Sequence, residues 1–411
     1  MRYFSSMGML KRFLEWRDSG EKTEAELIEI CRKRIREADA ELKAWVVVAP
    51  QKPLGDGPLR GIPFGVKDIF ETESLPTEFG SPLYKGRQSK VDAVLVRDLR
   101  RRGAVVLGKT QTAAFAYFDP APTRNPRNRE HTPGGSSSGS AAAVAAGMVP
   151  FALGTQTQGS VLRPASFCGI VGFKPTHGLL PLEGVLPFAS TLDTAGLFTE
   201  TVEDMRLLWQ HMGFPAGQAE TPRFGLPVSL PELVGPEIRE EFEKSAARLR
   251  AAVFATERVD LGFLHSEVLP AARLVNDYEG ARVHEQRWRE HGEKIGVRLS
   301  QLVADGLKIP AEKYAAALEI LGRARKRITQ VFEALPVLLT PAAPGPAPHG
   351  LSSTGDSRMN GPWTALGGPA ISVPMPVGSA LPMGLQLTAD SGHEARLLGA
   401  ALQVERVFLA R

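Results

Sequence analysis

The sequence has few cysteines and no cluster of metal-binding side chains. Only Cys31 and Cys168 occur among 411 residues, they do not form a CxxC motif, and the eight histidines stand alone. A disulfide-stabilised secreted fold and a structural zinc site both need more such residues at closer spacing. The scarcity therefore predicts a protein without a disulfide framework or a metal site, in a reducing cytoplasm.

Long hydrophobic runs and a strong charge of one sign are also missing. The uncharged stretch at residues 141–154 is mostly alanine and glycine and contains Pro150, so it suits a membrane span poorly. Lys11, Arg12 and Glu15 interrupt the N-terminal apolar residues, a pattern that does not fit an export signal. The net charge of +4, from 49 lysines and arginines against 45 acidic residues, is too small to predict a nucleic-acid or membrane partner.

What is present predicts an α/β protein. Hydrophobic residues make up 43% of the chain and charged residues 23%, which is the composition of a globular protein. Residues 91–110 combine a helical pattern, a glycine stop and a short apolar strand, a unit typical of layered α/β folds. No internal repeat or clear linker divides the chain. We therefore expect one domain over residues 1–411, with a central mixed β-sheet covered by helices on both faces.

Regions within this domain differ in character. Thr23 and Glu26 form a capping box that predicts a helix over residues 24–38. Residues 120–196, inside a core motif region at about 61–200, are rich in Gly, Ser, Thr and Pro, with a helix expected only at 140–148. Such a region is usually functional in a compact domain. Further strands are expected at 44–49, 336–344, 369–376 and 383–389, a peripheral helical layer at 236–335 and a last helix at 394–408.

A cluster of serines precedes an alanine run in TPGGSSSGSAAAVAAG, residues 132–147. Its GSSSG matches the nucleophile elbow of α/β-hydrolases and would nominate Ser137, but that motif needs a strand leading into the turn. The preceding residues are polar and contain Pro126 and Pro133, so no such strand is expected. No Lys-Ser or Lys-Thr pair follows the glycines, which excludes a Walker loop. Ser140 or a neighbour suits a helix cap, but a cap explains only one serine.

Three segments taken together indicate a different chemistry. They are GIPFGVKDIF at residues 61–70, the serine cluster, and GTQTQGSVLRPASFCG at residues 154–169. Together they resemble the amidase signature family. Residues 168–178 and 338–348 also look like segments of that family, so the resemblance covers most of the chain and is most specific in its middle third.

The resemblance implies a triad of Lys67, Ser136 and Ser160, the last lying 24 residues after Ser136. Ser160 would be the nucleophile, Ser136, after a cis peptide bond, the proton relay, and Lys67 the base. A lysine can act as a base only when neutral, so burial must lower its pKa from about 10.4, and a shift of about three units costs about 4 kcal/mol. Apolar neighbours of Lys67 suit this shift. Asp68 would oppose it unless its side chain faces the other way, as strand alternation allows.

The same resemblance implies an oxyanion hole from the backbone N–H groups of Thr157, Gln158 and Gly159, together with that of Ser160. The chain departs from the commoner family sequence GTDTGGSIRIPA, with Gln156 for aspartate and Gln158 for glycine. A backbone donor survives a change of side chain. The departures therefore concern substrate range rather than activity.

Two further residues are expected at the substrate. The variant GTQTxGSVxRPA resembles malonamidase-type amidases, in which the arginine matching Arg163 binds a substrate carboxylate. Its guanidinium fork suits bidentate carboxylate binding, and a structural ion pair or carbonyl contact is the alternative. Gly135 is expected to contact substrate. His131 and His177 lie nearest the motifs and are alternative bases, and helices within 236–335 should line the pocket without any single residue being assignable.

These observations predict an amidohydrolase without metal or cofactor. It would cleave a small-molecule carboxamide to a carboxylate and ammonia or an amine through an acyl-enzyme on Ser160. The expected partner is that amide alone, with neither nucleic acid nor membrane, and a homodimer is compatible with the sequence. Two alternatives stay open: the amidase subunit of a tRNA-dependent amidotransferase, which shares the triad, and a catalytically silent scaffold.

Overall fold

One mixed sheet of 11 strands runs through the structure, a computed structural model that describes residues 7–217, 223–232, 234–378 and 381–410. The strand order is β1-β3-β2-β4-β6-β5-β10-β11-β9-β7-β8, and both parallel and antiparallel neighbours occur. The strands are β1 Trp45–Gln51, β2 Pro63–Lys67, β3 Val105–Thr110, β4 Phe151–Gln156, β5 Val171–Lys174, β6 Thr194–Thr199, β7 Phe224–Pro227, β8 Thr256–Val259, β9 Val337–Pro341, β10 Ala370–Pro374 and β11 Gly384–Thr388.

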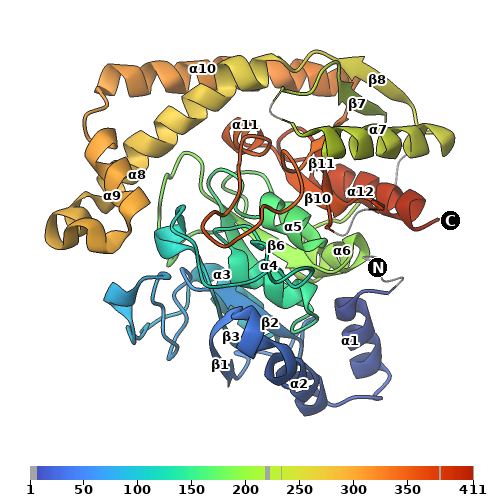
Figure 1. The fold of residues 1–411 in the computed structure, drawn as a ribbon. Helices are drawn as coiled ribbons and strands as arrows, with labels where there is room; N and C mark the ends of the chain where they lie inside the picture. Colours follow the sequence, from blue (N-terminus) through green and yellow to red (C-terminus); the bar gives the residue numbers. More distant parts are fainter. Residues whose placement is uncertain (1–6, 218–222, 233, 379–380, 411) are drawn as a thin grey trace.

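Helices pack on both faces of this sheet, so the predicted α/β fold is confirmed (Figure 1). The helices are α1 Met9–Asp18, α2 Glu24–Leu42, α3 Val94–Arg101, α4 Ser138–Ala145, α5 Leu162–Cys168, α6 Val202–His211, α7 Pro236–Ala251, α8 Leu269–His291, α9 Val297–Gly306, α10 Ala311–Ala334, α11 Gly361–Leu366 and α12 Glu394–Leu409. Among the described residues, no helix combines the length and apolar character needed to cross a membrane.

The start of α2 is the one that its sequence encodes. The Thr23 hydroxyl accepts a hydrogen bond from the backbone N–H of Glu26, and the Glu26 carboxylate accepts one from the backbone N–H of Thr23, at 3.3 and 2.8 Å. This capping box confirms the prediction. The helix continues four residues beyond the predicted end at Ala38, because Leu42 adds another buried side chain.

The segment at residues 120–196 is more regular than predicted. It contains β4, α5, β5 and the start of β6, and α4 begins at Ser138 rather than Ser140. Every residue of β4 is buried, so the strand lacks the alternation of apolar and polar residues by which strands are recognised. A fully buried strand that contains small residues has the composition of a loop, so its sequence does not predict a strand. This explains the error.

The expected helical layer at 236–335 contains α7 to α10, but also the strand β8. β8 pairs in parallel with β7, which pairs in parallel with β9, so this part of the chain also extends the sheet. Helix α8 packs against α9, α10 and α11. In Figure 1, α8, α9 and α10 lie together on the side of the molecule away from α1 and α2.

Candidate functional site

Lys67 is a buried lysine at the last residue of β2, between the parallel strands β3 and β4. Its Nζ donates hydrogen bonds to the hydroxyls of Ser136 and Thr155, each over 2.7 Å. Burial lowers the pKa of Lys67 well below its ordinary value, and the negative charge of Asp193 raises it in part. The site therefore favours the neutral amine, which is the form that can accept a proton.

The serine loop presents Ser136 to this lysine. The peptide bond between Gly135 and Ser136 is cis. The carbonyl oxygen of Ser136 accepts hydrogen bonds from the backbone N–H groups of Ala113 and Ser138, at 3.0 and 2.9 Å. These bonds hold the backbone of Ser136, and its side chain faces Lys67. Ser137, the residue of the GxSxG pattern, is fully buried and donates a 3.3 Å hydrogen bond to the carbonyl oxygen of Thr155.

Ser160 lies in the turn between β4 and α5 and is half-buried. Its side chain makes no hydrogen bond within the described part of the chain. Ser160 and Ser136 line the same pocket, and the rest of its lining comes from several other segments of the chain. The other lining residues are Ala116, Tyr117, Phe118, Thr157, Gln158, Arg163, Phe188 and Asn276. The fold thus brings the three residues of the implied triad to one place.

Four consecutive backbone N–H groups, those of residues 157–160, donate no hydrogen bond to any described residue. The next two donors, at Val161 and Leu162, are both taken by the side-chain oxygen of Gln156, at 2.9 and 3.0 Å. The Gln156 amide nitrogen in turn donates to the Thr364 hydroxyl over 3.0 Å. Gln156 therefore fixes the end of a loop whose unpaired donors are what an oxyanion hole requires.

Arg163 is almost fully buried and binds backbone carbonyl groups. Its Nε donates to the carbonyl oxygen of Thr354 over 2.8 Å, and Nη2 donates to that of Gly135 over 2.6 Å. Nη1 is buried without a partner among the described residues. These contacts match the structural alternative from the sequence, and carboxylate binding through Nη1 stays a prediction. The carbonyl group of Gly135 is held by Arg163, and Gly135 is absent from the lining of the described pocket.

The two histidines named as alternative bases lie elsewhere. His131 Nδ1 is 2.7 Å from the carbonyl oxygen of Ala347, and His177 Nε2 is 3.0 Å from that of Ser190. Neither lines the pocket that holds Ser160. Among the residues that the structure describes, no three His, Cys, Asp or Glu side chains are grouped so as to hold a metal ion.

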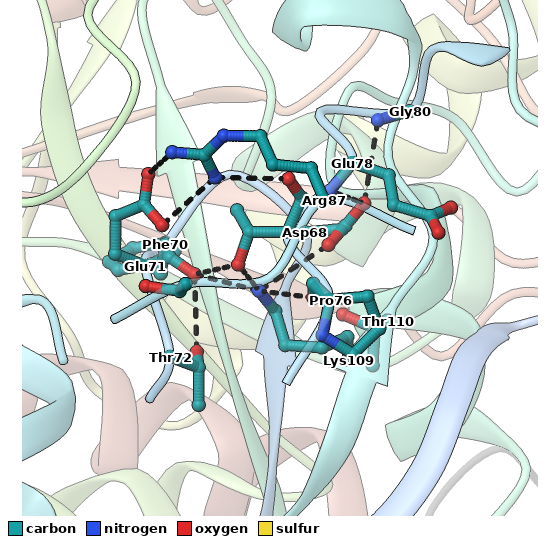
Figure 2. Close-up of polar contacts among 12 residues, drawn as sticks. Asp68, Phe70, Glu71, Thr72, Pro76, Glu78, Gly80, Arg87, Lys109 and Thr110 are labelled. Carbon is teal, nitrogen blue, oxygen red and sulfur yellow. Dashed lines mark hydrogen bonds and ion pairs between the residues drawn. The ribbon is translucent and has the colours of Figure 1, made fainter. Parts of the chain in front are cut away.

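Asp68, the neighbour of Lys67, faces a second buried lysine instead (Figure 2). Asp68 Oδ1 lies 3.4 Å from Lys109 Nζ, and Oδ2 accepts a 3.0 Å hydrogen bond from the backbone N–H of Glu78. Lys109 also donates to the carbonyl oxygen of Phe70 and the hydroxyl of Thr77, at 2.7 and 2.6 Å. Burial raises the pKa of Asp68 to about 6 and lowers that of Lys109 to about 8. This network anchors the chain that follows Lys67.

Removing one partner of this buried pair should be costly. Lys109→Met leaves the Asp68 carboxylate buried without its cation, so we expect a loss of about 3–5 kcal/mol of unfolding free energy. The double variant with Asp68→Asn should recover part of that loss. Urea denaturation measures both, with the exposed Lys313→Met as a control expected to stay within about 0.5 kcal/mol of wild type. A loss under about 1 kcal/mol for Lys109→Met would show that the pair is not a stabilising anchor.

A larger cavity of about 590 Å³ adjoins the Ser160 pocket. Four residues line both spaces: Tyr117, Phe118, Gln158 and Asn276. Helix α8 contributes Asn276 to both and Arg273 and Asp277 to the outer cavity. The helical layer therefore does line the site. Asn276 could have been found from the sequence, because an amide is unusual on a buried helix face whose other residues, except His284, are apolar or glycine.

Comparisons with known proteins agree on one type of enzyme. The family model Amidase matches residues 26–398. A glutamyl-tRNA(Gln) amidotransferase subunit of Symbiobacterium thermophilum is 31% identical over 460 aligned residues, which cover 95% of this chain and 94% of that protein. A solved structure described as an amidase is 28% identical with a TM-score of 0.89, covering 97% and 99% of the two chains. Peptide amidase from Stenotrophomonas maltophilia is 25% identical with a TM-score of 0.83, covering 100% and 99%.

The curated relatives contradict one expectation from the sequence. The family resemblance implied a small-molecule amide as the only partner, and the modest net charge argued against nucleic acid; this expectation about partners is wrong. The relatives are named for an amidotransferase of glutamyl-tRNA(Gln), and the same name recurs for relatives at 29–30% identity. Those relatives are named as subunits, and a subunit need not itself carry the basic surface that binds a phosphate backbone, so a modest net charge does not exclude a nucleic-acid partner.

Proposed function

Because the chain belongs to the amidase family of enzymes, which hydrolyse amide C–N bonds, we propose that it cleaves a carboxamide through an acyl-enzyme on Ser160. The observation that carries this proposal is the 2.7 Å hydrogen bond from the buried Lys67 to Ser136, beside the pocket that both serines line. A lysine with a lowered pKa, a relaying hydroxyl and an accessible second hydroxyl are the parts of an activated serine nucleophile.

In the proposed reaction, Ser160 Oγ attacks the carbonyl carbon of the amide. Its proton passes to Ser136 Oγ as the proton of Ser136 passes to Lys67 Nζ. The free N–H groups of residues 157–160 stabilise the oxyanion of the tetrahedral intermediate. The intermediate collapses when the leaving nitrogen takes the proton back from Lys67 through Ser136, which releases ammonia or an amine. Water then attacks the ester of Ser160 by the same proton route and releases the carboxylate.

Hydroxylamine tests whether an acyl-enzyme forms. An ester on Ser160 can be attacked by water or by hydroxylamine, so the product should divide between the carboxylate and the hydroxamate. Where acylation is the slow step, hydroxylamine should change this ratio and leave the rate of ammonia release unchanged. Direct attack of water on the bound amide gives no hydroxamate at the same concentration of hydroxylamine. Hydroxamate that is also formed by Ser160→Ala would come from another nucleophile and would contradict the proposal.

A second candidate function is the same hydrolysis within an amidotransferase, with this chain as its amidase component. It is favoured by the relatives of that name, which align over 93–97% of this chain. The test is purification of the tagged chain from its own cells, with mass spectrometry of the chains that copurify and an assay for amidation of glutamyl-tRNA(Gln). Copurifying chains that support amidation are expected. A chain that purifies alone and hydrolyses amides at full rate would contradict this second function but not the first.

Gln158 should limit which amides reach Ser160. Its side chain is buried, donates a 3.4 Å hydrogen bond to the carbonyl oxygen of Ala272, and lies where the two cavities meet. Gln158→Gly removes this side chain from the junction of the two cavities and so makes room for a larger acyl group. The ratio of kcat/KM for phenylacetamide to kcat/KM for acetamide should therefore rise about tenfold, the change expected for a few methylene groups of pocket space. An unchanged ratio of the two rates would show that Gln158 does not shape the pocket.

A further inference from the structure

Asp193 is a buried acid that lies beside the loop of residues 157–160 because of the register of two strands. β4 and β6 are antiparallel, with Gln156 opposite Thr194. One residue beyond that pair, Asp193 Oδ1 accepts a hydrogen bond from the Thr157 hydroxyl over 2.6 Å. Its Oδ2 accepts from the backbone N–H groups of Phe188 and Ala189, at 2.8 and 3.0 Å. One carboxylate thus receives three hydrogen bonds.

These three bonds join two walls of the Ser160 pocket. Thr157 is the first residue of the loop with unpaired N–H groups, and Phe188 lines the pocket from a separate segment of the chain. An acceptor held by two backbone donors has little freedom, so the Thr157 side chain is fixed by it. Charge-assisted bonds of this length are the strong ones among protein hydrogen bonds. A loop that must hold its N–H groups at a developing oxyanion needs such an anchor.

Asp193 also lies near Lys67, because the two side chains bind the hydroxyls of Thr157 and Thr155, which stand two residues apart at the end of β4 and so face the same side. Its negative charge raises the pKa of Lys67, against the larger effect of burial. Burial raises the pKa of Asp193 to about 6, and the negative charge of Glu279 on α8 adds a smaller rise. Glu279 itself accepts hydrogen bonds from the Thr191 and Tyr314 hydroxyls, at 2.5 and 2.7 Å. The hydrogen bonds from Thr157, Phe188 and Ala189 lower the pKa of Asp193 in part and so favour its ionised form, which is the form that acts on the lysine.

We propose that Asp193 is a positioning residue of the hydrolytic reaction, which holds Thr157 and the oxyanion loop in place and keeps a negative charge on the same side of the strand end as Lys67. This inference rests on the proposed function of Ser160 and Lys67. No step of the reaction passes a proton through Asp193. It acts through Thr157, by geometry, and through Lys67, by charge.

The pH profile of kcat/KM separates these roles from a merely structural one. Asp193→Asn keeps the shape of the side chain but removes its charge, so Lys67 loses its proton more easily and the acid limb should move to lower pH. The plateau should fall about 10- to 100-fold, as for other small displacements of catalytic groups. Thr157→Val removes the hydroxyl but keeps the backbone N–H, so it should lower the plateau and leave the limb where it is.

The exposed Asp305→Asn is the matched control and should change neither the plateau nor the limb. An Asp193→Asn variant with the wild-type plateau of kcat/KM would show that Asp193 does not position the loop. One with an unmoved acid limb would show that its charge does not act on Lys67, and either result overturns the proposal. If Asp193→Asn does not fold, wild-type activity of Thr157→Val overturns it instead. Turnover by Ser160→Ala would contradict the proposed function itself, so the two failures are distinguishable.

Discussion

Ser160→Ala should reduce kcat for carboxamide hydrolysis by about 10⁵- to 10⁶-fold, which is the loss seen when a serine nucleophile of a triad is removed. The remaining rate would come from the oxyanion donors and the bound geometry acting on water. The variant should fold normally, since the Ser160 side chain makes no hydrogen bond within the described residues. The release of ammonia from acetamide measures the loss of activity, and the unfolding temperature of the variant shows whether it folds normally.

Ser137→Ala is the matched control for this variant. Ser137 belongs to the same serine-rich sequence and matches GxSxG, yet its hydroxyl is fully buried against the carbonyl oxygen of Thr155. We expect Ser137→Ala to keep activity within about tenfold of wild type, because it removes two long neutral hydrogen bonds to the backbone of Thr155, each worth about 1 kcal/mol, and no hydrogen bond to Lys67, Ser136 or Ser160. A loss for Ser137→Ala equal to that for Ser160→Ala would contradict the assignment of roles.

Lys67→Met should lower the plateau of kcat by about 10²- to 10⁴-fold or more, the contribution of a positioned general base. In the wild-type enzyme the rate should rise with pH as Lys67 loses its proton. Burial lowers the pKa of Lys67 well below its ordinary value, so this rise should be complete at a pH far below the usual lysine range. The charged form, present below that pKa, cannot accept a proton and is inactive.

The pH profile of the Lys67 variants completes this test. Lys67→Met should lose the acid limb together with the activity, since the titrating group is gone. Lys67→Arg keeps a positive charge that does not titrate in proteins, so it should be equally inactive at every pH. An acid limb that persists unchanged in Lys67→Met would assign the limb to another group and would contradict Lys67 as the base.

The residues of the site that were predicted from sequence are those held by local motifs. Lys67, Ser136 and Ser160 stand in three short segments, and strand alternation correctly allowed Asp68 to face away from Lys67. Asp193 was missed because its contact with Thr157 depends on the pairing of two strands that were not predicted. The net charge of one chain does not tell which partners a larger enzyme built around it would bind, so the modest charge was a poor basis for excluding nucleic acid.

Covalent labelling identifies the group that attacks the amide, which we propose to be Ser160. The enzyme is treated with a fluorophosphonate, digested, and the modified residue located by mass spectrometry. We expect a single adduct on Ser160, whose formation parallels the loss of activity and is much slower in Lys67→Met. An adduct on Ser136, Ser137 or any other residue with the same loss of activity, or full labelling that leaves turnover intact, would contradict it.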